Sequence, residues 1–145
     1  MRVALGADHR GFFLKERIKA FLDELGHDPV DFGAPDSEPS DYPDPAIDAS
    51  EAVASGRCER GILICGTGIG MSIAANKVRG VIAARCCSVR DAEMCRRHNN
   101  ANVMTLSGET PPAEAQEMVR VFLDTPFEGG RHERRLRKIA GYEGK

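Results

Sequence analysis

An apolar run passes directly into a glycine-rich turn between Gly61 and Ser72, in the sequence GILICGTGIGMS. The run that ends at Cys65 is typical of a strand buried in a parallel sheet. Glycine then recurs at every second position, and residues 72–77 are good helix formers. Glycines let a backbone approach a ligand, and the start of a helix offers free N–H groups. The stretch therefore predicts an anion-binding turn beside one thiol and one hydroxyl.

Two known glycine motifs do not fit this turn. A phosphate-binding P-loop needs Lys after its second glycine, but Thr67 follows Gly66. A dinucleotide-binding turn needs a third glycine where Met71 stands, and Arg85 occupies the later position that should be acidic. Nucleotide binding is thus disfavoured. Two interpretations stay open: a site that uses Cys65, or a glycine turn beside a buried, inert cysteine.

Length and composition narrow the class of protein. The 145 residues suit a single domain, 1–145, with one core. A net charge of −2 gives no basic excess for nucleic acid, and no apolar run is long enough for a membrane span. Five cysteines, an odd number, argue against a disulfide framework, and without a C-x-x-C pair no zinc site is expected. With no signal peptide before the first strand, we expect a reducing, cytoplasmic setting.

Hydrophobic periodicity predicts alternating strands and helices along the whole chain. Strands are expected at 3–7, 28–32, 61–65, 80–84 and 103–106. Helices are expected at 14–25, from an Asp44 N-cap to about Ser55, from Ser72, at 91–97 and at 115–123, with a loop at 33–43. The basic segment 127–145 is expected to be a tail or helix that packs on this domain or on a partner subunit. The alternation predicts an α/β fold, a Rossmann-like three-layer αβα sandwich with a five-stranded parallel sheet.

Reactive side chains follow several of the predicted strands. Asp8 and His9 follow the first strand, Cys65 and Thr67 the third, and the turn 107–109 the fifth. Ligands of parallel sheets bind at the carboxyl ends of the strands, so we expect these side chains on one edge. This convergence favours a functional Cys65 over an inert one.

Six separated motifs occur in order over nearly the whole chain: GADHRG from Gly6, DYP from Asp41, CGTGIG from Cys65, AANK from Ala74, HN at His98 and GGRH from Gly129. Together they resemble the type B ribose 5-phosphate isomerases and the wider group with the galactose 6-phosphate and allose 6-phosphate isomerases. The resemblance implies no metal, no cofactor, and a homodimer or tetramer with sites shared between subunits. It implies aldose–ketose isomerisation of a sugar phosphate through an enediolate, with ribose 5-phosphate and ribulose 5-phosphate of the pentose phosphate pathway as the expected pair.

The resemblance also assigns roles around the glycine turn. Cys65 matches the base that removes the proton beside the carbonyl. Thr67 and the backbone amides of the turn match the groups that handle the enediolate oxygens. The glycines expected to contact substrate are Gly66, Gly68 and Gly70.

Further roles fall outside the turn. His98 matches the residue that helps to open the sugar ring, with Asp8 near it, and the His98 segment is expected from the partner subunit. His9, Arg131 and Arg135 match residues that contact the phosphate or neighbouring hydroxyls. The remaining residues expected to bind substrate are Tyr42 and Asn99.

General chemistry supports these roles, and structural alternatives stay open. A weak carbon acid needs preorganised N–H donors, a thiol ionises more readily at a helix start, and the guanidinium fork suits phosphate. Asp8 could instead be only a helix N-cap, His98 a turn residue, residues 131–138 a solvated helix face, and Tyr42 a loop anchor.

Glu109 departs from the family pattern, because members often carry an arginine at this place after the fifth strand. We expect Glu109 either to contact a sugar hydroxyl or to pair with a cation; the candidates are Arg90, Arg97 and Arg134. The departure leaves other substrates open: allose 6-phosphate, galactose 6-phosphate or a four-carbon sugar phosphate. A sugar-phosphate sensor without catalysis is the alternative from another class.

Overall fold

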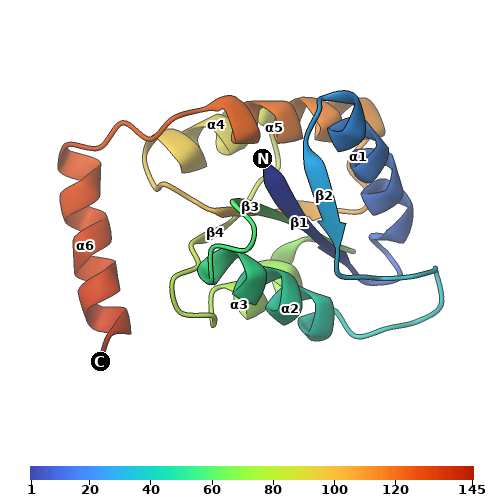
Figure 1. Cartoon of the computed structure of the whole chain (residues 1–145), viewed down its shortest axis with the longest axis horizontal. Coiled ribbons are helices and arrows are strands. Elements are labelled where there is room, and N and C mark those ends of the chain that lie inside the picture. The colour runs from blue at the N-terminus through green and yellow to red at the C-terminus, as the bar shows by residue number, and fades with distance from the viewer.

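The structure, a computed structural model, describes all residues 1–145 and contains five strands and six helices (Figure 1). The strands are β1 Arg2–Ala7, β2 Asp28–Asp31, β3 Arg60–Cys65, β4 Ala83–Arg85 and β5 Val103–Ser107. The helices are α1 Phe12–Glu24, α2 Pro43–Ala54, α3 Ile69–Ala75, α4 Val89–Arg97, α5 Pro112–Asp124 and α6 Arg131–Glu143. None of the helices is both long and apolar enough to span a membrane.

All five strands pair in parallel, in the order β2-β1-β3-β5-β4. The predicted α/β fold with a five-stranded parallel sheet is confirmed. The chain moves outward from β1 to β2 and then crosses back to β3, so the strand order reverses between β1 and β3. Open α/β sheets bind ligands at such a switch point, beyond the carboxyl ends of the strands. Asp8 and Cys65 stand at the two strand ends that flank it.

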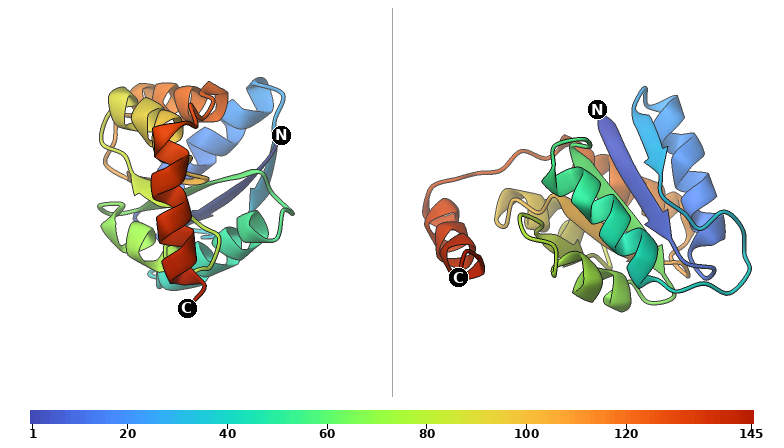
Figure 2. Two further views of the ribbon diagram at one scale, coloured as in Figure 1. Left: turned by 90° about the vertical axis from the view of Figure 1, so that its left-hand side faces the viewer. Right: turned by 60° about the horizontal axis from the view of Figure 1, so that its bottom comes forward.

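Helices cover both faces of the sheet (Figures 1 and 2). Strand residues alternate between the faces, so Leu5 and Ile64 pack with α1, α4 and α5, while Leu63 and Cys65 pack with α2 and α3. Each of the first three is fully buried, and Cys65 is 4% exposed. The Cys65 thiol therefore lies on the face covered by α2 and α3, at the end of a buried strand.

Several predicted boundaries differ from the structure. Helix α3 begins at Ile69 rather than Ser72, so Gly70 lies inside the helix. The fourth strand begins at Ala83 rather than Gly80, because Gly80 takes a positive φ of 88° and turns the chain. The Asn76 side chain donates to the Ala83 carbonyl at 2.9 Å and accepts from its N–H at 2.9 Å, which ties the end of α3 to the start of β4. Helix α2 begins at Pro43 with Tyr42 before it, so Asp44 lies in the first turn and is not the N-cap.

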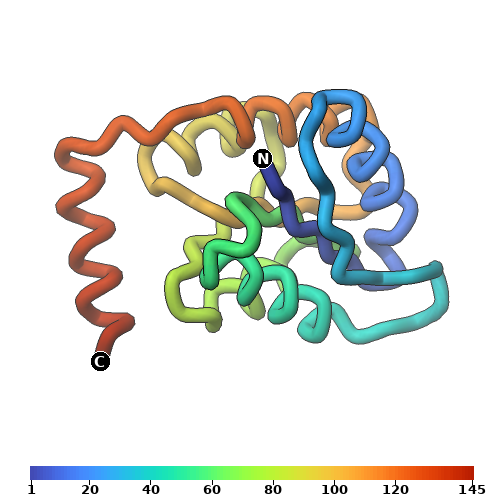
Figure 3. The backbone as a smooth tube through the Cα atoms, in the orientation of Figure 1, coloured from blue at the N-terminus to red at the C-terminus, as the bar shows by residue number.

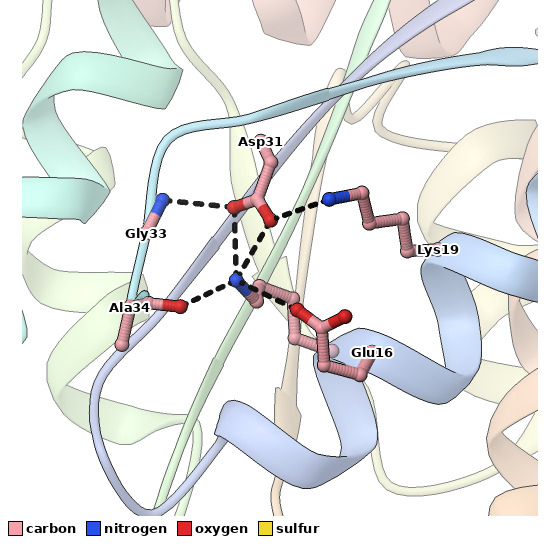
Figure 4. Close-up of polar contacts among 6 residues, drawn as sticks. Glu16, Lys19, Asp31, Gly33 and Ala34 are labelled. Atoms are coloured by element: carbon pink, nitrogen blue, oxygen red, sulfur yellow. Dashed lines mark hydrogen bonds and ion pairs between the residues drawn. The ribbon is translucent and has the colours of Figure 1, made fainter. Parts of the chain in front are cut away.

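A buried lysine joins α1 to the end of β2 (Figure 4). Lys15 Nζ donates to both carboxylate oxygens of Asp31, at 2.9 and 2.8 Å, and to the Ala34 carbonyl at 2.6 Å. Burial alone would raise the pKa of Asp31, but hydrogen bonds from Lys15, the Gly33 amide and Lys19 hold that pKa below its usual value. This network fixes the start of the loop 33–42, which swings outward and returns to α2 (Figure 3).

Helix α6 stands away from the sheet at the end of an extended segment (Figure 1). Its far end is held at the turn before β4, where the Gly80 N–H donates to Glu143 Oε2 at 3.1 Å and Arg79 donates to the Glu143 carbonyl at 3.2 Å. Apolar side chains of this helix stay open to solvent, with Ile139 59% and Tyr142 79% exposed.

Candidate active site

Cys65 ends β3 and is followed by the glycine turn. The Gly68 N–H donates to Cys65 Sγ at 3.2 Å, and the Ile69 N–H donates to Thr67 Oγ1 at 3.2 Å. Gly68 has a φ of +79°, which a side chain would strain, and an added Cβ would lie 2.9 Å from the Leu106 backbone. The turn thus depends on glycine at this position, and it points a backbone donor at the thiol.

Three side chains donate hydrogen bonds to the carbonyl groups of the turn. Ser107 Oγ donates to the Gly66 carbonyl at 2.7 Å, Arg85 Nε to the Thr67 carbonyl at 2.8 Å, and Thr105 Oγ1 to the Gly68 carbonyl at 2.9 Å. In a planar trans peptide the N–H points opposite to the C=O, so the N–H groups of the same three peptides face away from these side chains. Two of them, from Gly68 and Ile69, donate to Cys65 Sγ and Thr67 Oγ1. Such preorganised N–H donors are what a developing oxyanion needs. No sequence motif indicated the supporting role of these three side chains.

Asp8 lies at the end of β1 beside the same turn. The Asp8 N–H donates to the Ile64 carbonyl at 3.3 Å, next to Cys65. Asp8 Oδ1 accepts from the amides of Arg10 and Gly11 at 2.9 and 3.1 Å, just before α1. The carboxylate therefore organises the β1–α1 turn, but the N-cap alternative is wrong, because the N-cap of α1 is Gly11. Asp8 Oδ2 makes no hydrogen bond within the chain.

His9 and Tyr42 bring the loop 33–42 to the glycine turn. His9 Nδ1 accepts from the Ser40 N–H at 3.1 Å. The ring of Tyr42 covers Gly70 so closely that an added Cβ there would lie 2.7 Å from Tyr42 Cζ. Both side chains expected from the sequence are thus at the Cys65 edge, together with Asp8 and Thr67.

Arg10 is a cation at this edge that the sequence analysis did not assign. Its guanidinium lies against Gly66, where an added Cβ would collide with it. Arg10 Nη2 also lies 3.7 Å from Glu109 Oε1. The expected cationic partners of Glu109, Arg90, Arg97 and Arg134, are therefore wrong. The two residues follow β1 and β5, which flank β3, and this neighbourhood appears only once the strand order is known.

Cys65 lies at the carboxyl ends of the strands, whereas His98 lies near their amino ends. It is the C-cap of α4, and the chain enters β5 five residues later at Val103. Val103 pairs with Gly61, and Ser107 pairs with Cys65. Val103 and Ser107 are four residues apart on β5, so at roughly 3.3 Å per residue the start of this strand lies about 13 Å from the level of Cys65. Within one chain, the structure does not bring His98 and Cys65 together.

His98 belongs to a second cluster, at the junction of α4 and α6. Its ring stacks on that of His132 with centroids 4.3 Å apart and planes 13° apart. Glu128 Oε2 lies 3.5 Å from His98 Nε2 and accepts from Arg97 Nε at 2.8 Å. Asn99 follows His98 directly, and Arg131 opens α6 with Arg135 one turn later. The segment expected from the partner subunit, His98 and Asn99, thus shares one region of the chain with Arg131 and Arg135.

Electrostatics set the character of the cluster. Burial, followed by the charges of Arg131 and His98, lowers the pKa of His132. Burial would raise the pKa of Glu128, but the hydrogen bond and charge of Arg97 lower it. His98, Glu128 and His132 offer possible metal-ligand atoms within 4.8 Å of one another. Because the rings are stacked and Arg97 already holds the carboxylate, the geometry is that of an ion-paired cluster.

Comparison with known proteins agrees with these features. Residues 3–139 match the family described as Ribose/Galactose Isomerase. The chain belongs to this family. It is 43% identical over 143 residues to the ribose-5-phosphate isomerase B of Escherichia coli, covering 98% of this chain and 96% of that protein. It is 40% identical over 145 residues to the D-erythrulose-4-phosphate isomerase of Pectobacterium atrosepticum, covering 99% and 95%.

The fold of the chain also matches that of solved structures of this family. The ribose-5-phosphate isomerase B of Clostridium thermocellum superposes with a TM-score of 0.97 at 45% identity, covering 99% of this chain and 98% of that one. The resemblance that the six motifs indicated is therefore confirmed. Membership of the Ribose/Galactose Isomerase family makes the chain a sugar-phosphate aldose–ketose isomerase in type, while these two relatives are named for sugars of different length.

Proposed function

We propose that this chain interconverts ribose 5-phosphate and ribulose 5-phosphate with Cys65 as the base. The observation that carries the proposal is the hydrogen bond from the Gly68 N–H to Cys65 Sγ. It lies within a turn whose carbonyls accept hydrogen bonds from three side chains. A backbone donor on sulfur favours the negative charge that a base must carry, and the neighbouring amides suit an oxyanion.

The chemistry follows from this arrangement. The Cys65 thiolate removes the proton from the carbon beside the carbonyl, and an enediolate forms. Thr67 Oγ1 and the backbone amides of the turn from Gly66 to Gly70 stabilise the charge on its oxygens; loss of one such donor typically costs about 3–4 kcal/mol of barrier. The hydroxyl proton then passes from one enediolate oxygen to the other beside Thr67 Oγ1, and Cys65 returns its proton to the neighbouring carbon. No net proton is gained or lost, and no metal is called for.

We also infer that the active unit is at least a homodimer with sites shared between subunits. His98 and Cys65 lie at opposite sheet edges, so a site that uses both must combine two chains. In that site the partner's copies of four residues face Cys65: His98 helps to open the sugar ring near Asp8, and Arg131, Arg135 and Asn99 hold the phosphate and hydroxyls. From the Cys65 chain, His9 and Tyr42 border the substrate.

An assay with a panel of aldose phosphates tests this function. The protein is incubated with ribose 5-phosphate, allose 6-phosphate, galactose 6-phosphate and erythrose 4-phosphate, and ketose formation is followed. We expect the highest kcat/KM for ribose 5-phosphate. A higher value for another sugar would replace the substrate but keep the reaction. Tight binding of these sugars with no turnover of any would instead support a sugar-phosphate sensor.

A further inference from the structure

Arg10 is poised at the Cys65 edge with its donors free. Its side chain is 55% exposed, and its guanidinium makes no hydrogen bond within the chain. Its one charged partner, Glu109, is 3.7 Å away and 82% exposed. Such a loose, solvated pair contributes little stability, so another anion can replace the carboxylate at little cost.

Two other cations near this edge are already engaged. Arg85 donates through Nε to the Thr67 carbonyl at 2.8 Å and through Nη1 to Cys87 Sγ at 2.6 Å. Lys15 is buried and held by Asp31 and Ala34. Of these three cations, Arg10 alone has a side chain that makes no hydrogen bond within the chain.

We propose that Arg10 is a substrate-binding residue that holds the anionic group of the substrate, with Glu109 as its counter-ion in the empty site. The inference rests on the proposed function for the identity of the substrate, an acyclic or ring-opened sugar phosphate. A guanidinium offers two parallel N–H bonds to a phosphate, which a carboxylate 3.7 Å from one nitrogen does not fully use. The substrate phosphate displaces Glu109, and the carboxylate turns to water.

This arrangement explains why a carboxylate can stand beside an anionic substrate. Two like charges held close together in a site repel each other. Because the phosphate takes the place of Glu109 on Arg10 and the carboxylate turns to water, the two anions do not compete for the site at the same time. Because Arg10 lies over Gly66, one residue beyond Cys65, the anionic end of the substrate is placed close to the reacting carbons.

The test compares four variants in KM, kcat and binding of inorganic phosphate measured by calorimetry. Arg10→Ala should raise the KM for ribose 5-phosphate at least about tenfold, equivalent to about 1.4 kcal/mol, and change kcat less than about threefold. Arg10→Lys keeps the positive charge but loses the two parallel N–H donors, so its KM should lie between those of the wild type and Arg10→Ala. Glu109→Gln should lower KM or leave it unchanged. Arg2→Ala is the matched control, because Arg2 forms a similar loose pair with Asp28 at 3.3 Å at the other end of β1.

Phosphate binding separates this inference from the proposed function. We expect Arg10→Ala to weaken binding of inorganic phosphate about tenfold with an unchanged melting temperature, whether or not ribose 5-phosphate is the substrate turned over. If no aldose phosphate is isomerised but Arg10 still governs phosphate binding, the proposed function fails and the assignment of Arg10 stands. Unchanged KM and unchanged phosphate affinity in folded Arg10→Ala would overturn the assignment.

Discussion

The imidazole rings of His98 and His132 lie parallel, with centroids 4.3 Å apart and an angle of 13° between their planes. This stack joins the end of α4 to the first turn of α6, although 34 positions of sequence separate the residues (132 minus 98). It makes His98 and the arginines of α6 one structural unit. The cluster therefore reaches any partner site as a whole rather than residue by residue.

Subunit mixing tests whether sites are shared. Cys65→Ala and His98→Ala proteins should each be nearly inactive. After subunit exchange the mixture should regain activity, because one of the two sites in a heterodimer holds an intact Cys65 and an intact partner His98. Activity is measured before and after exchange, with heterodimers detected by native mass spectrometry. Heterodimers without any recovery would mean that both residues act within one subunit.

The arginines of α6 should bind the phosphate. Arg131→Ala and Arg135→Ala should each raise the KM for ribose 5-phosphate at least about tenfold, or about 1.4 kcal/mol of binding. Arg137→Ala is the matched control on the same helix, since Arg137 is 76% exposed and pairs with Glu133 at 3.1 Å. Steady-state kinetics of the three variants decide the matter. If none of the three variants raises KM, the arginines of α6 do not bind the phosphate and the helix presents only a solvated face.

Lys15 and Lys19 both pair with Asp31 but differ in burial, 1% against 38% exposed. Lys15→Met removes three hydrogen bonds and leaves a partly buried carboxylate, so the free energy of unfolding should fall by about 2–3 kcal/mol, below the usual cost of breaking a fully buried pair. Lys19→Ala should cost at most about 1 kcal/mol. Urea denaturation measures both, and equal losses would show that burial does not matter here.

The same network predicts an acid dependence. The pKa of Asp31 is lowered in the folded protein, because the hydrogen bonds from Lys15, Gly33 and Lys19 outweigh burial. Its stabilisation is thus fully present above the unfolded pKa of about 4 and is lost as pH falls through the lower folded pKa. The stability gap between wild type and Lys15→Met should be constant from about pH 5 to 7 and shrink below about pH 4. A gap that does not shrink in acid would rule out the Asp31 charge as its source.

Much of the fold was predictable because strand and helix periodicities leave direct traces in the sequence. The strand-end rule also placed Asp8, Cys65 and Thr67 on one edge without any knowledge of strand order. The supporting residues were not predictable in this way. Arg10, Thr105 and Ser107 act on the glycine turn because β1 and β5 flank β3, and alternation of elements does not reveal which strands are neighbours. The start of β4 was misplaced because the Asn76 side chain, rather than a longer strand, satisfies the Ala83 backbone.

The most direct test of the account is kcat for ribose 5-phosphate in Cys65→Ala, compared with Cys58→Ala. Both thiols are buried in the same core, at 4% and 1% exposed, but only Cys65 accepts the Gly68 N–H. Loss of a general base typically costs about 10²-fold or more, so Cys65→Ala should lose at least that factor while Cys58→Ala keeps a near-normal kcat. Near-normal turnover by folded Cys65→Ala would contradict the assignment of Cys65 as the base.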